Sequence, residues 1–456
     1  MRIFSTMITA ALLALPATSP ADARSVLMIS IDGMNPEYVT EAQARGLKMP
    51  NLQRFMMEGS YASGVTGVLP TVSWPSAATL MTGVEPARHR VLNNNRFVPP
   101  DRNRSSSAYF FASDVKADTL WDAAARAGLI TANVDQLVSV GNPNIRYDIP
   151  RFEPFSSWPE NRKAIEATAR PVTLLPELEA KLGAYTGVDF DNPDYDRSRA
   201  RFAIEIMRRY KPQFMSIHLS GVDVNAHAHG PYSPEAKAAA ELIDGLIGEL
   251  RETALAADPE TVIAIVSDHG QIPYTRAFNA RIPFVEAGLI AIDAPVPGKA
   301  VRVTGWQADF WGNAVMLKNP ADAAVKAKVS DLLRHLAADP ANGIVRVLDE
   351  AEIRTFGGFP DASFLLEMKN GTVLGNSLFG SLVTEFPTVR GTHGELPSNP
   401  GMNASFFIVG KGVRAGRNLG QIDMRQIAPT VAQALSMKLK DATQPVLAAF
   451  GTGSAR

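Results

Sequence analysis

The sequence predicts an α/β protein, a layered α/β/α fold with a mostly parallel central sheet and an inserted smaller α+β subdomain. Four short apolar runs lead to this prediction, because they lack polar alternation and so suit strands that helices cover on both faces. The runs are 26–31, 214–219, 261–266 and 405–409. Between the second and third runs, Ser233-Pro234-Glu235 begins a helical pattern with an N-cap, a proline and a first-turn acid. Strands that alternate with helices are typical of this fold class.

The composition excludes several classes of protein. Of the 456 residues, 46% are hydrophobic and 20% are charged, which allows a large buried core and argues against disorder. Lysine and arginine (45) nearly equal aspartate and glutamate (46), so the net charge of −1 offers no basic excess for dedicated nucleic-acid binding. The absence of cysteine excludes disulfides, thiolate metal sites and cysteine nucleophiles.

The N-terminus has the pattern of an export signal. Arg2 precedes an apolar stretch at 7–15, and Ala21-Asp22-Ala23 fits an A-x-A cleavage site. We therefore expect residues 1–23 to be a signal peptide and the mature chain to be exported, periplasmic in a Gram-negative host and otherwise secreted. No later segment reaches 18 apolar residues, so we expect no transmembrane segment in the mature chain.

The segment 293–386 differs in pattern from its surroundings. Glycine and proline interrupt it at 295–298 and 357–360, and a helix is expected at about 320–338. A hairpin is expected from 363–368 and 372–374 around Asn370-Gly371. We therefore divide the chain into a main domain, 24–292 with 387–456, and an inserted subdomain, 293–386.

Carboxylates and imidazoles follow three of the predicted strands, and a glycine-flanked histidine lies further along the chain. The residues are Asp32, Asp223, His227, Asp268, His269 and His393. Ligands of open α/β sheets bind at the carboxyl ends of the strands, so we expect these side chains at one edge. Aspartate and histidine without cysteine are typical ligands of a catalytic divalent cation, zinc first. Six ligands are too many for one ion, but they fit two ions about 3.5–4 Å apart. Such a pair of ions stabilises both the attacking and the leaving oxygen of an in-line phosphoryl displacement.

Ser73 is the candidate nucleophile. It precedes Trp74-Pro75, a rigid turn that can open a helix and place the hydroxyl at the helix N-terminus, where a phosphate is favoured. Coordination to a metal would ionise this hydroxyl without a general base. On spacing alone, a simple helix N-cap is the favoured interpretation of Ser73.

Five short motifs occur in a characteristic order. They are Ile31-Asp32-Gly33, Pro70-Thr71-x-Ser73-Trp74-Pro75 with Thr82-Gly83, Asp223-x-x-x-His227-x-x-Gly230-Pro231, Ser267-Asp268-His269-Gly270 and Gly391-Thr392-His393-Gly394. With these motifs the chain resembles the type I phosphodiesterase/nucleotide pyrophosphatase family of the alkaline phosphatase superfamily. The resemblance implies an alkaline phosphatase-like fold and makes 24–292 with 387–456 its metal-binding catalytic domain.

The resemblance also implies a role for each matching residue. The six candidate ligands divide between two zinc ions, Asp223, His227 and His393 at one, and Asp32, Asp268 and His269 at the other. Ser73, where the family usually has threonine, would bind the second ion as the nucleophile. Asn94 would bind a phosphoryl oxygen, and Trp74 would stack on a base.

The implied function is that of an exported, zinc-dependent hydrolase of phosphodiester or pyrophosphate bonds. It would act on a small-molecule substrate through a covalent phosphoseryl intermediate. On the same metal core, the alternatives are a phosphomonoesterase, with Arg90 or Arg146 as an extra phosphate clamp, and a phosphonate hydrolase. A sulfatase fits less well, because Ala77 stands where its modification motif requires arginine. Outside enzymes, the alternative is a non-catalytic periplasmic metal- or anion-binding protein.

Overall fold

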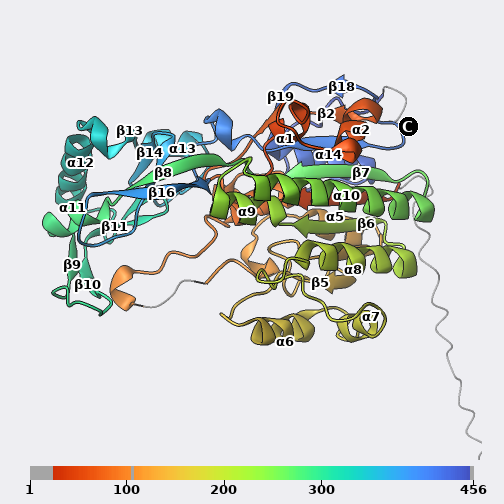
Figure 1. The fold of residues 1–456 in the computed structure, drawn as a ribbon, viewed down its shortest axis with the longest axis horizontal. Helices are drawn as coiled ribbons and strands as arrows, with labels where there is room; N and C mark the ends of the chain where they lie inside the picture. The colour runs from red at the N-terminus through yellow and green to blue at the C-terminus, as the bar shows by residue number, and fades with distance from the viewer. Residues whose placement is uncertain (1–23, 104–106, 452–456) are drawn as a thin grey trace, which may run out of the picture.

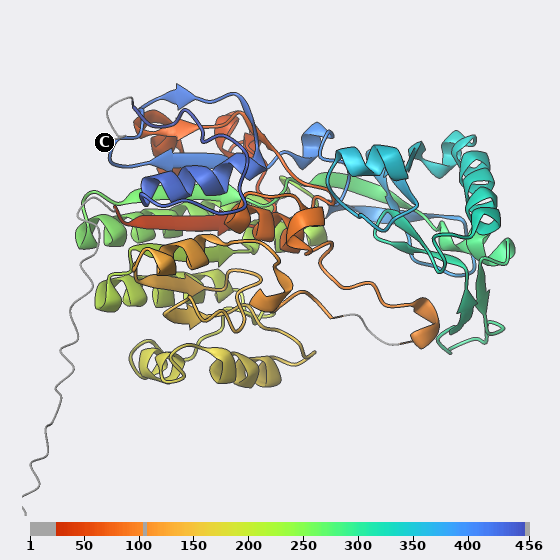
Figure 2. The ribbon, with the colours of Figure 1, turned by 180° about the vertical axis from the view of Figure 1, so that it is seen from behind.

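The computed structural model describes residues 24–103 and 107–451. The predicted signal peptide, 1–23, lies outside the described residues. Figures 1 and 2 show a large lobe built on a central sheet and a smaller lobe at one end of it. Within the described ranges, no helix combines the length and the apolar character needed to cross a bilayer.

The large lobe contains an eight-stranded sheet with the order β18-β2-β17-β7-β1-β6-β4-β5. Its strands are β1 (Val26–Ile31), β2 (Ser60–Tyr61), β4 (Thr131–Val134), β5 (Tyr147–Ile149), β6 (Phe214–Leu219), β7 (Val262–Ser267), β17 (Phe406–Val409) and β18 (Arg417–Asn418). The predicted strands 26–31 and 214–219 are confirmed, and the third begins one residue later than predicted. Because β1 pairs in parallel with both β6 and β7, it lies at the centre of a mostly parallel sheet.

Strand β17 departs from the predicted parallel arrangement. It is buried as expected, but it pairs antiparallel with both β7 and β2. The chain leaves β7 at its carboxyl end, forms the smaller lobe and returns to the same end of the sheet, so β17 runs back against β7. The apolar run 405–409 therefore predicts burial correctly, but burial on both faces does not determine strand direction.

Helices cover both faces of this sheet, and each face has its own hydrophobic cluster. Leu27, Ile29 and Ile31 of β1 face one cluster, whereas Val26 and Met28 face the other. The first face is covered by α2 (Pro50–Glu58), α6 (Trp158–Thr168), α7 (Leu174–Leu182), α8 (Tyr195–Tyr210) and α10 (Pro234–Ala257). The second is covered by α3 (Ser73–Thr82), α5 (Leu120–Arg126) and α14 (Ile427–Ala434). This is the predicted α/β/α layering.

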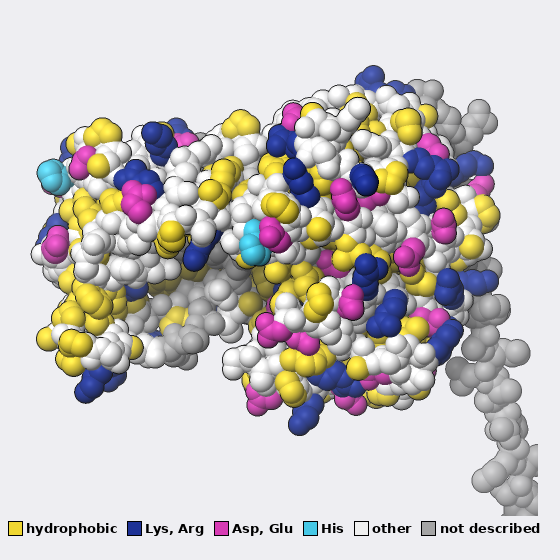
Figure 3. Space-filling view, in the orientation of Figure 1, with side chains coloured by type: hydrophobic (Ala, Val, Ile, Leu, Met, Phe, Trp, Pro, Cys, Tyr) yellow, Lys and Arg dark blue, Asp and Glu magenta, His cyan; other side chains and the backbone are white. Residues whose placement is uncertain are grey.

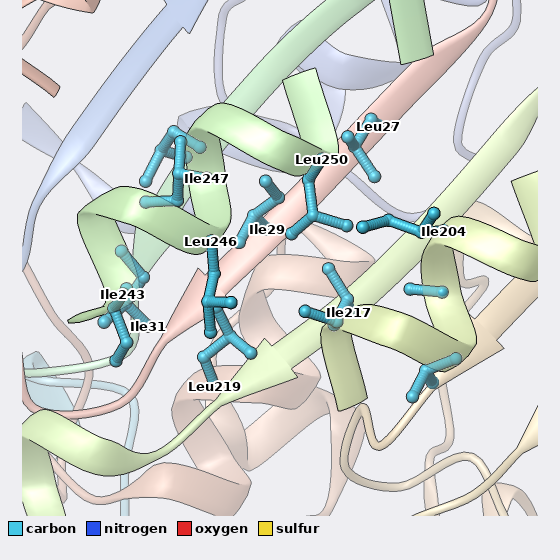
Figure 4. Close-up of a cluster of buried hydrophobic side chains, with 14 of the residues drawn as sticks. Leu27, Ile29, Ile31, Ile204, Ile217, Leu219, Ile243, Leu246, Ile247 and Leu250 are labelled. Atoms are coloured by element: carbon cyan, nitrogen blue, oxygen red, sulfur yellow. The ribbon is translucent and has the colours of Figure 1, made fainter. Parts of the chain in front are cut away.

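Figure 4 shows the first cluster between α10 and the central strands. Leu246 and Leu250 of α10 lie over Ile29 of β1. The helix begins as predicted, because the Ser233 hydroxyl accepts a hydrogen bond from the Ala236 N–H at 3.2 Å. The cap and the apolar stripe together place α10 across the sheet.

The remaining elements of the large lobe are short. They are α1 (Glu37–Thr40), β3 (Gly64–Thr66), α4 (Pro86–His89), α9 (Gly221–His229) and β19 (Gln421–Asp423). Strand β3 pairs in parallel with β19 outside the main sheet. Helix α9 follows β6 directly and carries two of the candidate metal ligands.

The smaller lobe contains three further sheets, with the orders β15-β8-β16, β11-β12-β14-β13 and β10-β9. Its strands are β8 (Ile272–Phe278), β9 (Ile290–Ile292), β10 (Val303–Trp306), β11 (Ala308–Trp311), β12 (Ala314–Leu317), β13 (Ile344–Asp349), β14 (Phe364–Met368), β15 (Gly371–Leu374) and β16 (Val383–Thr392). Its helices are α11 (Arg281–Glu286), α12 (Ala323–Ala337) and α13 (Glu350–Thr355). Figure 1 shows that β8 and β16 run side by side between the two lobes.

One prediction for this lobe is confirmed and one is wrong. The helix expected at about 320–338 is α12. The hairpin expected around Asn370-Gly371 does not form, because β14 pairs with β12 and β13 whereas β15 pairs in parallel with β8. The turn at Gly371, with a φ of +95°, sends the chain into a different sheet. The boundaries at 293 and 386 stay a prediction.

On the face drawn in Figure 3, basic and acidic side chains are interspersed over both lobes. No large region of a single sign is visible there. Hydrophobic side chains gather over the end of the smaller lobe that carries β9 and β10.

Candidate metal centre

The candidate ligands meet at the carboxyl ends of the central strands. Asp32 follows β1, Asp223 lies in the first turn of α9 after β6, and Asp268 with His269 follows β7. His227 lies one turn after Asp223 on α9. The sixth ligand, His393, follows β16, the long strand that returns from the smaller lobe.

Gly33 allows two of these segments to approach closely. It has a φ of +70°, and a Cβ atom at this position would lie 3.0 Å from the Oδ1 atom of Asp223. Its N–H also donates to the Oδ1 atom of Asp268 at 3.1 Å. A residue with a side chain at position 33 would therefore be strained and would crowd a candidate ligand.

The three candidate histidines share one hydrogen-bond arrangement. The Nδ1 atom of each lies close to a backbone carbonyl: Gly391 O for His227 at 2.9 Å, Gly270 O for His269 at 3.1 Å and Thr71 O for His393 at 3.0 Å. A carbonyl only accepts, so Nδ1 carries the proton in each ring and Nε2 presents a lone pair. This is the arrangement that prepares an imidazole to bind a metal through Nε2.

The Nε2 atoms converge with carboxylate oxygens into two groups. In the first, His227 Nε2 lies 3.1 Å from His393 Nε2, and the two lie 3.4 Å and 3.8 Å from Asp223 Oδ1. In the second, His269 Nε2 lies 3.3 Å from Asp32 Oδ1, and Asp223 is the third member. The Asp268 Oδ2 atom lies 3.7 Å from the same Nε2 atom. The structure thus brings together all six predicted ligands, with Asp223 common to both groups.

Several of these atoms lack a hydrogen-bond partner. Asp32 Oδ1 and Asp268 Oδ2 are buried and unpaired among the described residues. Facing lone pairs on His227 and His393 would repel each other without a cation between them. Buried acceptors without donors are costly, whereas a divalent cation satisfies carboxylate oxygens and imidazole nitrogens together. The donor set therefore fits divalent metal ions.

The electrostatics lead to the same conclusion. Burial raises the pKa values of Asp223 and Asp268 well above their usual range, and the nearby charge of Asp32 adds to both shifts. For Asp32, burial alone would raise the pKa, but the hydrogen bond and charge of His218 and the neighbouring imidazoles lower it overall. Burial lowers the pKa of His269 to about 4 and that of His393 well below its usual value. These two imidazoles are neutral at neutral pH, as metal ligands must be.

Ser73 lies at the edge of the second group. It is the first residue of α3, only 5% exposed, and its Oγ atom lies 3.3 Å from His269 Nε2. The N-cap position is taken by Val72, and Ser73 makes no capping bond of its own. The simple N-cap interpretation is therefore wrong, because the hydroxyl points to the ligands rather than back to the helix backbone.

Asn94 reaches the same helix terminus. Its Oδ1 atom accepts a hydrogen bond from the Trp74 N–H at 3.1 Å, which leaves the amide N–H groups to donate elsewhere. The neighbouring Asn95 instead offers its backbone carbonyl to the indole N–H of Trp311. Of the consecutive asparagines, it is Asn94 whose side chain contacts the segment that carries Ser73.

Comparison with known proteins identifies relatives of this chain. The profile of the type I phosphodiesterase/nucleotide pyrophosphatase family matches residues 26–355, most of the chain. The chain belongs to this family. Mouse ectonucleotide pyrophosphatase/phosphodiesterase family member 1 is 24% identical over 256 residues, 55% of this chain and 24% of that protein. An uncharacterized pyrophosphatase/phosphodiesterase of Schizosaccharomyces pombe is 25% identical over 253 residues, 55% of this chain and 45% of that protein. The match thus spans less than half the length of these two curated relatives.

Two solved structures share the fold. Human ectonucleotide pyrophosphatase/phosphodiesterase 5 superposes with a TM-score of 0.61 at 16% identity, covering 92% of this chain and 96% of that one. A mutant of the alkaline phosphatase PafA superposes with a TM-score of 0.66 at 14% identity, covering 95% and 100%. The predicted alkaline phosphatase-like fold and family resemblance are therefore confirmed.

An aromatic row extends from the segment that carries Ser73. Trp74 packs edge to face against Phe110 at 6.3 Å between ring centroids, and Phe110 packs in the same way against Phe152 at 5.2 Å. Phe152 also contacts the exposed ring of Phe111 at 5.7 Å. The row leads from the buried end of α3 to the surface.

Of the two arginines considered as phosphate clamps, one forms an ion pair and the other lies at the opposite edge of the sheet. Arg90 is exposed, ends α4 and pairs with Asp361 at 3.7 Å. Arg146 precedes β5, so it lies at the amino end of a parallel strand, opposite the edge with the ligands. Arg151 lies after the carboxyl end of β5, but its guanidinium is paired with Asp135 at 3.2 Å and Glu153 at 2.7 Å.

His218 and Gln271 stand outside the sequence motifs, yet both contact candidate ligands. The Nε2 atom of His218 lies 3.2 Å from the Asp32 Oδ2 atom, and the side-chain amide of Gln271 donates to Asp223 Oδ1. His218 lies inside an apolar run that carries no motif, so the sequence does not distinguish it from an ordinary core histidine. The register of the sheet brings His218 to Asp32. It pairs His218 of β6 with Ser30 of β1, and Asp32 lies two residues after Ser30. His89, in contrast, is the buried last residue of α4, and its Nε2 atom lies 3.0 Å from the Thr79 hydroxyl of α3.

Proposed function

We propose that the protein is an exported, two-metal phosphodiesterase/nucleotide pyrophosphatase that forms a covalent phosphoseryl intermediate on Ser73. The observation that carries the proposal is the convergence of three Nε2 lone pairs and unpaired carboxylate oxygens beside the Ser73 hydroxyl. Divalent ions, zinc first for this donor set, would lower the pKa of that hydroxyl and offset the charge on the phosphoryl oxygens.

The residues of the chain then perform two displacements. The Ser73 Oγ atom, having lost its proton to solvent, attacks phosphorus, and the bond from phosphorus to the leaving oxygen breaks as that oxygen takes up a proton. Water next attacks the phosphoserine, releases the second product and restores Ser73. The amide of Asn94 donates a hydrogen bond to a non-bridging phosphoryl oxygen, and this bond strengthens as charge develops there.

Two observations support a diester or pyrophosphate over a phosphomonoester. A monoester carries an additional charge that a cationic side chain would offset. Arg90 pairs with Asp361, Arg146 lies at the opposite edge of the sheet, and Arg151 is paired with two carboxylates. The aromatic row from Trp74 to Phe152 offers a surface on which a nucleobase or another flat group can stack. The names of the curated relatives, pyrophosphatase/phosphodiesterases, agree with this substrate class.

The remaining parts of the proposal rest on the sequence. Export rests on the signal-peptide pattern of residues 1–23. The division into a catalytic domain, 24–292 with 387–456, and an insertion, 293–386, rests on the change in pattern along the chain. From the sequence, we also expect the insertion, 293–386, and the segment 150–171 to influence which leaving group is accepted.

The test compares two chromogenic esters on the zinc-loaded chain 24–456. We expect rapid hydrolysis of bis(4-nitrophenyl) phosphate and slow hydrolysis of 4-nitrophenyl phosphate. Ser73→Ala should lower kcat for the diester by about 10³-fold or more, because the nucleophile is lost. Ser73→Thr keeps a hydroxyl and serves as the matched control, with activity expected within about tenfold of the wild type.

Metal analysis of each variant completes this test. Two ions per chain in both wild type and Ser73→Ala would show that the loss of activity is not a loss of metal. A preference for the monoester would favour the phosphomonoesterase alternative. Two bound ions without turnover of either ester would contradict the proposal and favour a binding protein.

A further inference from the structure

His218 lies inside the most buried part of the sheet. It belongs to β6, is 0% exposed and is paired in register with Ser30 of β1. Its flanking residues, Ile217 and Leu219, point into the hydrophobic cluster under α10, whereas the imidazole lies on the other face of the strand. Burial of an imidazole here is costly unless both ring nitrogens find partners.

Both nitrogens do have partners, and the partners determine the tautomer. Nε2 lies 3.2 Å from Asp32 Oδ2, and Nδ1 lies 3.2 Å from the Ser30 Oγ atom. A carboxylate only accepts, so Nε2 carries the proton and donates, and Nδ1 accepts from the Ser30 hydroxyl. His218 is therefore protonated on the opposite nitrogen from the three candidate ligands, and it offers no lone pair on the side of Asp32.

The contact with His218 involves only the Oδ2 atom of Asp32 and leaves the Oδ1 atom without a hydrogen-bond donor among the described residues. Oδ2 is held by His218, while Oδ1 is buried, unpaired among the described residues and 3.3 Å from His269 Nε2. Asp268 shows the same division: its Oδ1 atom accepts from the N–H groups of Gly33 at 3.1 Å and His269 at 3.0 Å, and Oδ2 is unpaired. The backbone holds one carboxylate, and His218 performs this role for the other.

We propose that His218 is a positioning residue that holds Asp32 with Oδ1 directed to the ion of the Asp32, Asp268 and His269 group. It does not bind the ion itself. The proposal rests on the metal centre proposed above, and it predicts a site-specific effect. Loss of the His218 donor should weaken the ion at this group and leave the ion at Asp223, His227 and His393 unchanged.

The test measures zinc stoichiometry and affinity by competition with a chromogenic chelator. In His218→Phe, which fills the space without a donor, we expect one of the two ions to bind about 10- to 100-fold more weakly. His218→Gln retains an N–H near the Nε2 position, so its affinity should recover to within a few-fold of the wild type. His89→Phe is the matched control, since His89 is equally buried but contacts no candidate ligand, and both its ions should bind as in the wild type.

The outcomes separate this inference from the proposed function. Two ions bound with wild-type affinity in His218→Phe would overturn the positioning role and leave the metal centre intact. Equal weakening in His218→Phe and His218→Gln would also overturn it, because the donor would then be irrelevant. A wild-type chain that binds no zinc would overturn both proposals together.

Discussion

Hydrogen bonds to backbone carbonyls orient the three candidate histidines for the metal-ligand role proposed above. The carbonyls of Thr71, Gly270 and Gly391 each hold an Nδ1 proton, so the three Nε2 atoms turn inward as acceptors. The carbonyl of Thr71 is itself placed by its side chain, whose hydroxyl donates to the Glu395 carbonyl at 2.7 Å. Residues that never touch substrate thus determine which imidazole nitrogen is available.

The amide of Asn94 should contribute to the rate rather than to metal binding. Asn94→Ala should lower kcat for bis(4-nitrophenyl) phosphate by about 10²- to 10³-fold, the usual cost of one donor to a developing oxyanion. Asn94→Asp keeps the acceptor for the Trp74 N–H but loses the donor, so it should fall at least as far. Steady-state kinetics and zinc analysis measure both effects. Asn95→Ala, at an exposed neighbour, is the control, and Asn94→Ala with wild-type kcat would contradict the assignment.

The residues that the sequence could predict are those that stand in short motifs after strands. Asp32, Asp223 and Asp268 follow apolar runs, and His269 and His393 have glycine neighbours. His218 lies inside a strand, and Gln271 lies just beyond a motif. Thr71 lies within a motif, but its residue type gives no sign that its backbone carbonyl contacts His393. Their contacts depend on the register between β1 and β6 and on residues that lie 48 to 322 positions away in the chain, which one sequence does not encode locally.

At the scale of elements, the strands were predictable and their partners were not. An apolar run of six residues determines burial, and so β1 and β6 match the predicted ranges. Strand direction and pairing depend on the path of the chain between strands. This is why β17 runs antiparallel and why β15 joins β8 rather than β14.

Strand β5 contains a buried acid that should make stability depend on pH. Asp148 is 0% exposed, accepts from the Asn133 amide at 2.7 Å and has its second oxygen unpaired among the described residues. Burial raises its pKa from 3.8 to about 8. Between these values the folded chain retains a proton that the unfolded chain has lost, so the free energy of unfolding decreases as pH rises, by at most about 6 kcal/mol.

Asp148→Asn should remove this pH dependence. We expect the variant to match the wild type near pH 4 and to be more stable near pH 8, where the wild type must ionise or hold its proton. Thermal unfolding across this range, with chelator present throughout, measures the difference. Asp331→Asn, at an exposed acid paired with Arg334, should follow the wild-type curve. Parallel curves for wild type and Asp148→Asn would contradict the prediction.

At the scale of the whole molecule, folding gathers negative charge that the chain does not neutralise. Asp32 and Asp268 directly follow β1 and β7, and Asp223 lies in α9 after β6. Burial raises the pKa values of Asp223 and Asp268 well above the usual range. The carboxylates of these residues repel one another when they are ionised, and bound divalent cations would instead attract each of them. The stability of the fold and its metal content should therefore be linked.

Removal of the ions should lower the melting temperature. An ion present at 100 times its Kd adds about 2.7 kcal/mol to the free energy of unfolding, so a chelator should produce a clear decrease. Calorimetry with and without chelator, followed by re-addition of zinc, measures the effect. Asp268→Asn, which weakens one site, should show a smaller decrease. An unchanged melting temperature after proven loss of both ions would contradict the link.

The attachment of the smaller lobe has a consequence for protein engineering. Five of the six candidate ligands follow strands of the large sheet, whereas His393 directly follows β16, which pairs with β8 at both of its ends. The same strand supplies the Gly391 carbonyl that orients His227. The smaller lobe therefore cannot be removed together with β8 and β16 without loss of contacts to the candidate ligands. A shortened chain that retains the candidate site has to keep β8 and β16. The new connection between them belongs near Phe278 and Val383, where the two strands are still paired.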